Sequence, residues 1–426
     1  MKQILSALAK AKNISAWKIN ATTTESCELF YVQKKVETIR ATDTTDYSLT
    51  VYVDQDGKRG QSGFTVYPYM EEEEILALIE ENAAIAALTL NDPFDLPHPQ
   101  GKSHPEVQSN LAAEPFRNII GKIGAAIMKA NKVENASLSA TEIFLYRVNN
   151  RVINSNGVDE SSTSYRCRIE TIPNYVKGEE EVELYQAISF GSFDPETLTK
   201  KVADAIKLCK DRAFAIKMPK IAELPVILQD EETAQFFASF VEDLDYGTAY
   251  HHYNIFNLGD DIQEGRTGDT LDIELRPFVE GALSSTYVDV DGVVLQPVHI
   301  IQDGKVVARH GNYRYGIYMK EENPTGMVPI ACVKEGTSSM ADFAKKPYLR
   351  CVRFSDMQVD PFSGFVGGEV RLAYYFDGEK EIPVTGLTIQ GDFKKLKSSF
   401  LLSKETIVLD EYAGPKYVYF PSVKIV

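Results

Sequence analysis

The clearest hydrophobic pattern lies near the middle of the chain, where a short apolar run is followed by residues at helical spacing. The run PVIL predicts a buried strand. After it, Phe237, Val241 and Leu244 recur at i, i+4 and i+7, which predicts a helix with one apolar face. Asp230 is the expected N-cap and Gly247 the expected stop. Whether this helix carries a metal site decides the functional interpretation of the chain.

Before this helix, strand-like and helix-like segments follow one another in the same order twice. Alternating β-branched and aromatic residues predict strands between residues 16 and 66, and again between 136 and 190. Apolar residues at helical spacing predict helices at 1–12, 71–88, 114–131 and 195–214. Residues 136–214 therefore echo the layout of residues 25–88, although the residues themselves differ.

After residue 262 turn signals dominate the pattern and helical spacing nearly vanishes. Asp291-Gly292, Asp303-Gly304 and Asp377-Gly378 each separate two β-rich runs, which is typical of antiparallel hairpins. Short helices are predicted at 339–345 and 392–402, and closing strands at 406–409 and 416–426.

These elements predict an α+β fold of two domains. Residues 1–218 would form an amino-terminal domain of mixed sheets with helices. Residues 219–426 would form a largely antiparallel β domain around a central strand–helix unit. Residues 91–105 are rich in proline and have no periodicity, so they are predicted to be a linker within the first domain. Its two histidines, His98 and His104, are predicted to be exposed.

Composition and charge narrow the classes of function. The 426 residues carry a net charge of −16, which disfavours direct contact with nucleic acid. No apolar run approaches the roughly 20 residues of a membrane span, and no targeting segment is recognised, so a cytoplasmic protein is expected. The five cysteines form no C-x-x-C pair, which favours reduced thiols over a disulfide framework or a zinc ribbon.

Three stretches together carry a resemblance to a known family. They are SLTVYVDQDGKRGQSGF with the helix that follows it, RVINSNGVDESSTSY, and the long segment from LPVILQDEETAQFFASFVEDLDYG to VTGLTIQGD. In order and spacing they resemble the TldD/PmbA family, also known as modulators of DNA gyrase, over nearly the whole chain. The resemblance implies a two-domain α+β protein. It also implies that catalytic relatives are cytosolic zinc metallopeptidases that cut unfolded peptides.

The resemblance also defines what a catalytic chain would contain. Catalytic members carry H-E-x-x-x-H on the helix after the PVIL-like strand, and a Cys near the carboxy-terminus. The histidines and the Cys hold zinc, and the Glu is the general base. Here the helix has no His, and Ala413 stands where the resemblance places the Cys. The region is therefore interpreted as vestigial, with no zinc of its own expected; its residues are Ser239, Glu242, Asp243, His251 and Ala413.

The first functional prediction is a non-catalytic, TldE-like subunit of a cytosolic zinc metallopeptidase complex that degrades or matures unfolded peptides. Zinc would belong to a TldD-like catalytic partner, or the chain would form a homodimer, and the ligand would be an unstructured peptide. Two alternatives stay open. One is an active peptidase whose metal site is rebuilt from Glu242, Asp243 and His251. The other is a protein-binding modulator of DNA gyrase that contacts neither DNA nor a membrane directly.

Overall fold

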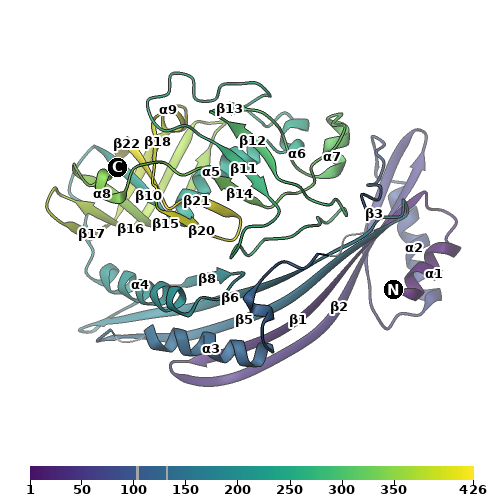
Figure 1. The fold of residues 1–426 in the computed structure, drawn as a ribbon, viewed down its shortest axis with the longest axis horizontal. Coiled ribbons are helices and arrows are strands. Elements are labelled where there is room, and N and C mark those ends of the chain that lie inside the picture. The colour runs from purple at the N-terminus through teal and green to yellow at the C-terminus, as the bar shows by residue number, and fades with distance from the viewer. Residues whose placement is uncertain (102–104, 131–132) are drawn as a thin grey trace.

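The computed structural model describes residues 1–101, 105–130 and 133–426, which form two β-rich halves (Figure 1). The amino-terminal half is one eight-stranded sheet in the order β4-β3-β2-β1-β5-β6-β7, with β8 also paired to β6. Its strands are β1 (Ala16–Val32), β2 (Lys35–Gln55), β3 (Lys58–Val66), β4 (Leu90–Asn91), β5 (Ala136–Asn154), β6 (Asp159–Lys177), β7 (Glu180–Glu183) and β8 (Gln186–Phe190). Every pairing is antiparallel, so the predicted mixed sheets are corrected to one antiparallel sheet. The pairing is antiparallel because consecutive strands are joined by hairpins. The β1–β2 hairpin extends the sheet on one side of the β1–β5 pair, and the β5–β6 hairpin extends it on the other.

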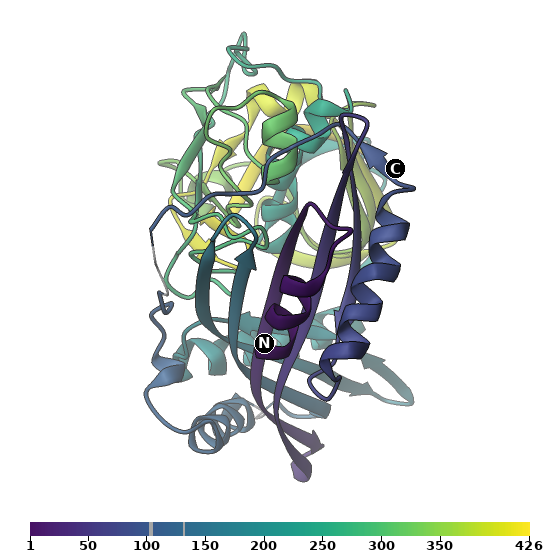
Figure 2. The same ribbon diagram turned by 90° about the vertical axis from the view of Figure 1, so that its right-hand side faces the viewer.

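Two pairs of helices cover one face of this sheet. They are α1 (Lys2–Lys10) with α2 (Glu72–Ala86), and α3 (Phe116–Ala130) with α4 (Pro195–Ala213); a 3-10 turn, η1 (Asn110–Ala112), precedes α3. The two helix pairs lie at different ends of the long strands (Figures 1 and 2). Ile19 of β1 packs with α1 and α2, and Leu29 packs with α3 and α4. Since these residues are ten apart on one strand, they point to the same face. The repeated layout predicted from the sequence is present in the fold. On each side of the β1–β5 pair, antiparallel strands are followed by a helix that packs on the sheet.

The other face of the sheet is polar and meets the carboxy-terminal half. Lys18 pairs with Asp291, and Asn20 donates to the carbonyl oxygen of Val290 at 2.8 Å. Farther along, the hydroxyl of Ser162 accepts from the backbone N–H of Tyr287 at 3.1 Å. The two halves therefore meet through hydrogen bonds and ion pairs spread along the sheet.

Two sheets make up the carboxy-terminal half. One, in the order β15-β10-β22-β18-β16-β17-β9, also pairs β19 with β22; the other runs β13-β12-β11-β14-β21-β20. The first contains β9 (Ile216–Lys217), β10 (Glu223–Gln229), β15 (Tyr348–Asp360), β16 (Phe365–Phe376), β17 (Glu381–Thr385), β18 (Leu387–Asp392), β19 (Leu401–Leu402) and β22 (Tyr417–Ile425). The second contains β11 (Ile273–Arg276), β12 (Val298–Gln302), β13 (Lys305–Val306), β14 (Ile330–Val333), β20 (Thr406–Val408) and β21 (Tyr412–Pro415). Most pairings are antiparallel, and the predicted α+β class is confirmed.

Five helices accompany these sheets. They are α5 (Glu231–Asp243), α6 (Tyr246–Tyr250), α7 (Tyr313–Tyr318), α8 (Met340–Phe343) and α9 (Phe393–Ser399). The predicted helices at 339–345 and 392–402 correspond to α8 and α9. The short helix α7 was not predicted, because six residues provide too little periodicity. No helix in the described ranges is long and apolar enough to cross a membrane.

Helix α5 forms the centre of the carboxy-terminal core, as its pattern predicted. Phe236, Phe237 and Phe240 are fully buried, and the ring of Phe236 lies 5.0 Å from that of Phe420 in β22. The ends of the helix differ from the prediction. Asp230 precedes it with φ of 50° and makes no side-chain cap, and Gly247 lies inside α6 instead of ending α5.

The predicted linker runs from the amino-terminal sheet onto α7. Phe94 is buried between Tyr52 of β2 and Tyr318, with ring centroids 5.9 and 6.0 Å away. Arg59 Nη1 donates to the carbonyl oxygen of Phe94 at 2.5 Å. His98 is exposed, as predicted, and its Nε2 lies 2.8 Å from Asp95, whereas His104 lies outside the described residues.

Candidate functional site

The face of α5 opposite its phenylalanines lines a cavity of about 800 Å³ between the two halves. From α5 the cavity receives Ala234, Gln235, Ala238, Val241 and Glu242. The opposite wall comes from α4, from β8 and from Arg168 in the middle of β6. The remaining wall includes residues of β14, β15 and β20, the segment after β20, and Leu283-Ser284. Residues from sites far apart in the sequence therefore enclose one space beside α5.

Of the residues singled out from sequence, Glu242 is the one that lines this cavity. Ser239 is buried, and its hydroxyl donates to the carbonyl oxygen of Phe236 at 2.7 Å. The carboxylate of Asp243 accepts from the backbone N–H groups of Ile255 and Phe256 at 2.7 and 3.0 Å. Burial raises the pKa of Asp243, and these two hydrogen bonds oppose that rise. Asp243 thus anchors the segment after α6.

His251 and Ala413 lie in other surroundings. His251 caps the end of α6, and its Nε2 lies 3.3 Å from the hydroxyl of Tyr315 in α7. Ala413 lies in β21, in register with Cys332 of β14. The cysteines are all free thiols, and each is buried except Cys332, which is half-buried.

The residues on α5 do not fit a zinc site. A structural or catalytic zinc ion takes three or four His, Cys or carboxylate ligands. On the cavity face, Glu242 is flanked by the aliphatic side chains of Ala238 and Val241. Across residues 1–101, 105–130 and 133–426, no group of three or more His, Cys, Asp or Glu side chains is arranged to hold a metal ion.

One end of the cavity instead holds a group of charges of both signs. Lys416 Nζ lies 3.8 Å from Asp230, and Arg353 Nη1 lies 3.7 Å from Glu231. Burial raises the pKa of Asp230, although Lys416 opposes the rise. Burial likewise raises the pKa of Asp410, with opposing effects from nearby cations. This end of the cavity is therefore partly desolvated, so its charges interact more strongly than they would at an open surface.

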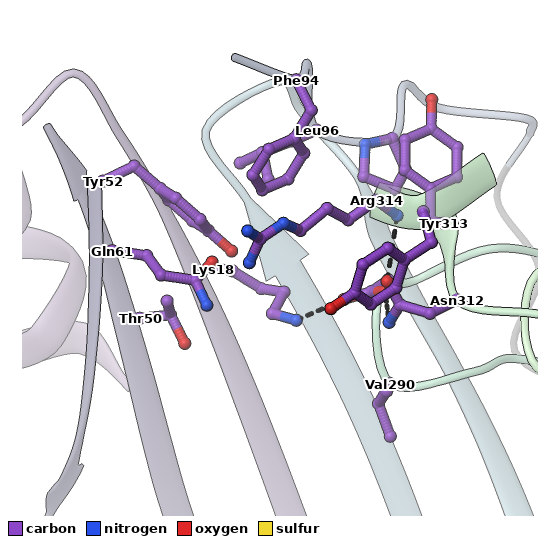
Figure 3. A pocket seen from close by; sticks show the side chains of 13 residues that line it. Lys18, Thr50, Tyr52, Gln61, Phe94, Leu96, Val290, Asn312, Tyr313 and Arg314 are labelled. Carbon is purple, nitrogen blue, oxygen red and sulfur yellow. Dashed lines mark hydrogen bonds and ion pairs between the residues drawn. The ribbon is translucent and has the colours of Figure 1, made fainter. Parts of the chain in front are cut away.

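A smaller cavity of about 280 Å³ lies at the other end of the interface, beside the linker (Figure 3). There Lys18 from β1 reaches Asp291, which also accepts from Asn312 Nδ2 at 3.0 Å. The guanidinium of Arg314 lies 5.4 Å from the ring centroid of Phe94, a cation–π contact. These charged and polar groups already have partners within the protein. We therefore interpret this cavity as part of the interface that joins the two halves.

Sequence reasoning missed the charged residues that strands bring to the interface, such as Arg166, Arg353 and Asp410. Each lies on or beside a strand, where alternation predicts an outward polar side chain. In each case the other half of the molecule covers that outward face, and no local pattern in the sequence predicts this burial.

The comparisons with known proteins agree with this architecture. Residues 222–426 match the family model described as the PmbA/TldA metallopeptidase C-terminal domain. A search of curated proteins finds no match to the sequence.

Three solved structures align with the whole chain. A proposed modulator of a DNA gyrase from Thermotoga maritima shares 17% identity, with a TM-score of 0.78 and coverage of 100% of this chain and 99% of that one. TldE from Thermococcus kodakarensis shares 16%, with a TM-score of 0.80 and coverage of 100% and 99%. A proposed modulator of DNA gyrase from Bacteroides thetaiotaomicron shares 14%, with a TM-score of 0.82 and coverage of 100% and 97%. Because these identities are only 14–17%, the comparison shows that the folds are similar and does not extend to function.

Proposed function

Since the resemblance to the TldD/PmbA family is confirmed, with residues 222–426 matching its carboxy-terminal domain, we propose that this chain is a non-catalytic, TldE-like subunit. It would pair with a zinc-bearing member of the family and help to hold an unfolded peptide. The observation that supports this most is the cavity face of α5. In the region where catalytic members carry H-E-x-x-x-H, this face has no His or Cys; it presents Glu231, Ala234, Gln235, Ala238, Val241 and Glu242.

The walls of the 800 Å³ cavity suit an extended peptide. β20 is the last strand of its sheet, and β8 pairs with β6 alone among the described strands, so both offer backbone groups at an edge. An extended chain can add to such an edge through main-chain hydrogen bonds, whatever its sequence. Apolar side chains such as Ile188, Ile407 and Leu409 lie between the charged groups and would contact the side chains of the peptide.

Metal content and association together test this proposal. The chain is purified alone and together with a family member that carries H-E-x-x-x-H, and zinc is measured by mass spectrometry. We expect little zinc and no cleavage of an unstructured peptide by the chain alone, and a stable complex with the catalytic member. One zinc ion per chain together with peptidase activity in the chain alone would contradict the proposal. Loss of that activity in Glu242→Gln or His251→Ala would then identify a rearranged site.

A further inference from the structure

A half-buried cation, with no ion-pair partner among the described residues, lies on the polar face of the amino-terminal sheet. Arg166 of β6 stands opposite Tyr146 of β5, and its Nε is buried without a hydrogen-bond partner in the described part of the chain. Burial lowers the pKa of the guanidinium, and the opposing effect comes from Tyr146 and from no carboxylate. A buried, unpaired guanidinium is costly unless something else pairs with it.

Arg166 lines a cavity of about 310 Å³ between the sheet and the segment from Leu283 to Val290. The other charged groups of this cavity are already paired. Arg151 forms two hydrogen bonds with Asp159, at 2.7 and 2.8 Å. The carboxylate of Asp289 accepts from three backbone N–H groups, at 2.9, 2.9 and 3.1 Å. Arg166 is thus the group left to bind an incoming anion.

This cavity adjoins the one beside α5. Leu283 and Ser284 line both of them. Arg166 and Arg168 lie on the same face of β6, roughly 7 Å apart along the strand, and Arg168 lines the cavity beside α5. A peptide that leaves the α5 cavity along β6 therefore reaches Arg166 within about two residues.

We propose that Arg166 forms a subsite for a carboxylate group of the bound peptide, either its terminal carboxylate or an Asp or Glu side chain. The inference rests on the proposed peptide-holding function. The planar guanidinium presents parallel N–H groups that match a carboxylate in two hydrogen bonds. The polar neighbours Asn150 and Ser164 of the same cavity add donors around it.

Fluorescence anisotropy with labelled, unstructured peptides tests the subsite in the full chain and in its complex. Three peptides of one sequence are compared: one with a free carboxy-terminus, one amidated, and one amidated with a single internal Glu. The variants are Arg166→Gln, Arg166→Lys and a control, Arg147→Gln. Arg147 is a neighbour in the same strand pair, where its Nε donates to the Tyr165 hydroxyl at 3.3 Å, and it lies on the opposite face.

We expect the unmodified chain to bind a carboxylate-bearing peptide about ten- to a hundredfold more tightly than the fully amidated one. Arg166→Gln should abolish that difference, Arg166→Lys should keep part of it, and Arg147→Gln should keep it all. Whichever carboxylate gives the preference identifies its source. Arg166→Gln should also leave the Tm unchanged or raise it, because it removes a half-buried charge that has no carboxylate partner in the described part of the chain.

Equal binding of all three peptides by the unmodified chain would overturn the subsite and leave peptide holding intact. A fall in Tm with an equal loss of affinity for all peptides would show that Arg166 has a structural role instead. Failure of every peptide to bind, alone and in complex, would overturn both peptide holding and the subsite. Zinc content and partner association would still report separately on the subunit assignment.

Discussion

At the scale of single residues, Glu232 has a raised pKa because of burial, although it lies where the dipole of a helix favours the charged form. It lies in the first turn of α5, where the helix dipole favours a negative charge. Its side chain is nevertheless buried, its Oε2 has no hydrogen-bond partner in the described ranges, and desolvation raises its pKa to about 8. The carboxyl group is therefore mostly neutral at neutral pH.

This raised pKa predicts how stability depends on pH. Between about 4.5 and about 8 the unfolded chain releases the proton of Glu232 while the folded chain retains it, so stability falls as pH rises through this window. The contribution is at most on the order of 5 kcal/mol. Urea unfolding at a series of pH values should show a shallower decline for Glu232→Gln, which should exceed the unmodified chain in stability at pH 8.5. Parallel curves for the two proteins would contradict the raised pKa.

At the scale of elements, the two faces of α5 have separate roles. Phe236 contacts the rings of Phe393, Phe400 and Phe420, so its side chain joins both ends of α9 and β22 in the core. Ala238, two residues later, faces the cavity. Packing thus depends on one side of the helix, and the properties of the cavity depend on the other.

Substitutions on the two faces should therefore differ in their effects. Phe236→Ala should lower the free energy of unfolding by about 3–5 kcal/mol, because it leaves a large hole among aromatic rings. Ala238→Ser should change it by less than about 0.5 kcal/mol, because the hydroxyl enters an open cavity. Chemical denaturation of both variants measures the contrast. A large loss for Ala238→Ser would mean that this face of α5 is packed.

The elements also show how far the sequence alone leads. Several strands were predicted between residues 16 and 66 from their hydrophobic residues, and the structure shows that β2 continues without a break through residues 42–46. Residues 42–46 are polar and exposed, so they lack the hydrophobic signal of a strand. Their conformation comes from pairing with β1, where the hydroxyl oxygens of Ser26 and Thr42 lie 2.7 Å apart. A partner strand supplies this order, and single-sequence patterns do not contain it.

The candidate site was predictable only where it lies on one element. Glu242 could be found because α5 has strong periodicity. Arg353 and Asp410 join the same cavity from segments more than a hundred residues away in the chain. Their proximity depends on tertiary pairing between β10 and its neighbours, which no spacing along the chain reveals.

At the scale of the whole molecule, the linker fastens one half to the other. Phe94 lies between the amino-terminal sheet and α7, and the hydroxyl of Tyr318 in α7 donates to the carbonyl oxygen of Asp92 at 2.6 Å. A separate apolar contact, between Leu208 of α4 and the strands β15 and β16, joins the halves elsewhere. We therefore expect the small apolar contact of Phe94 to control how firmly the halves are joined at this end.

Phe94→Ala should loosen the joint without unfolding either half. Hydrogen exchange measured by mass spectrometry should speed up in α7 and around Asp291, while amides in α3 and α4 keep their protection. Phe94→Leu, which retains an apolar side chain, is the matched control and should exchange more slowly than the alanine variant. Uniformly faster exchange throughout the chain would show instead that the substitution destabilises the fold globally.

The central position of β22 has a consequence for synthesis on the ribosome. The amino-terminal sheet needs only residues up to 190, so it can close while translation continues. β10, by contrast, receives its antiparallel neighbour only when β22 emerges about 200 residues later, since Leu224 pairs with Val423. Until then the phenylalanines of α5 lack the cover of Phe420, so apolar surface that favours aggregation stays exposed during synthesis. A premature stop before residue 417 would yield a folded first half attached to an unclosed second half, a substrate for cellular proteases.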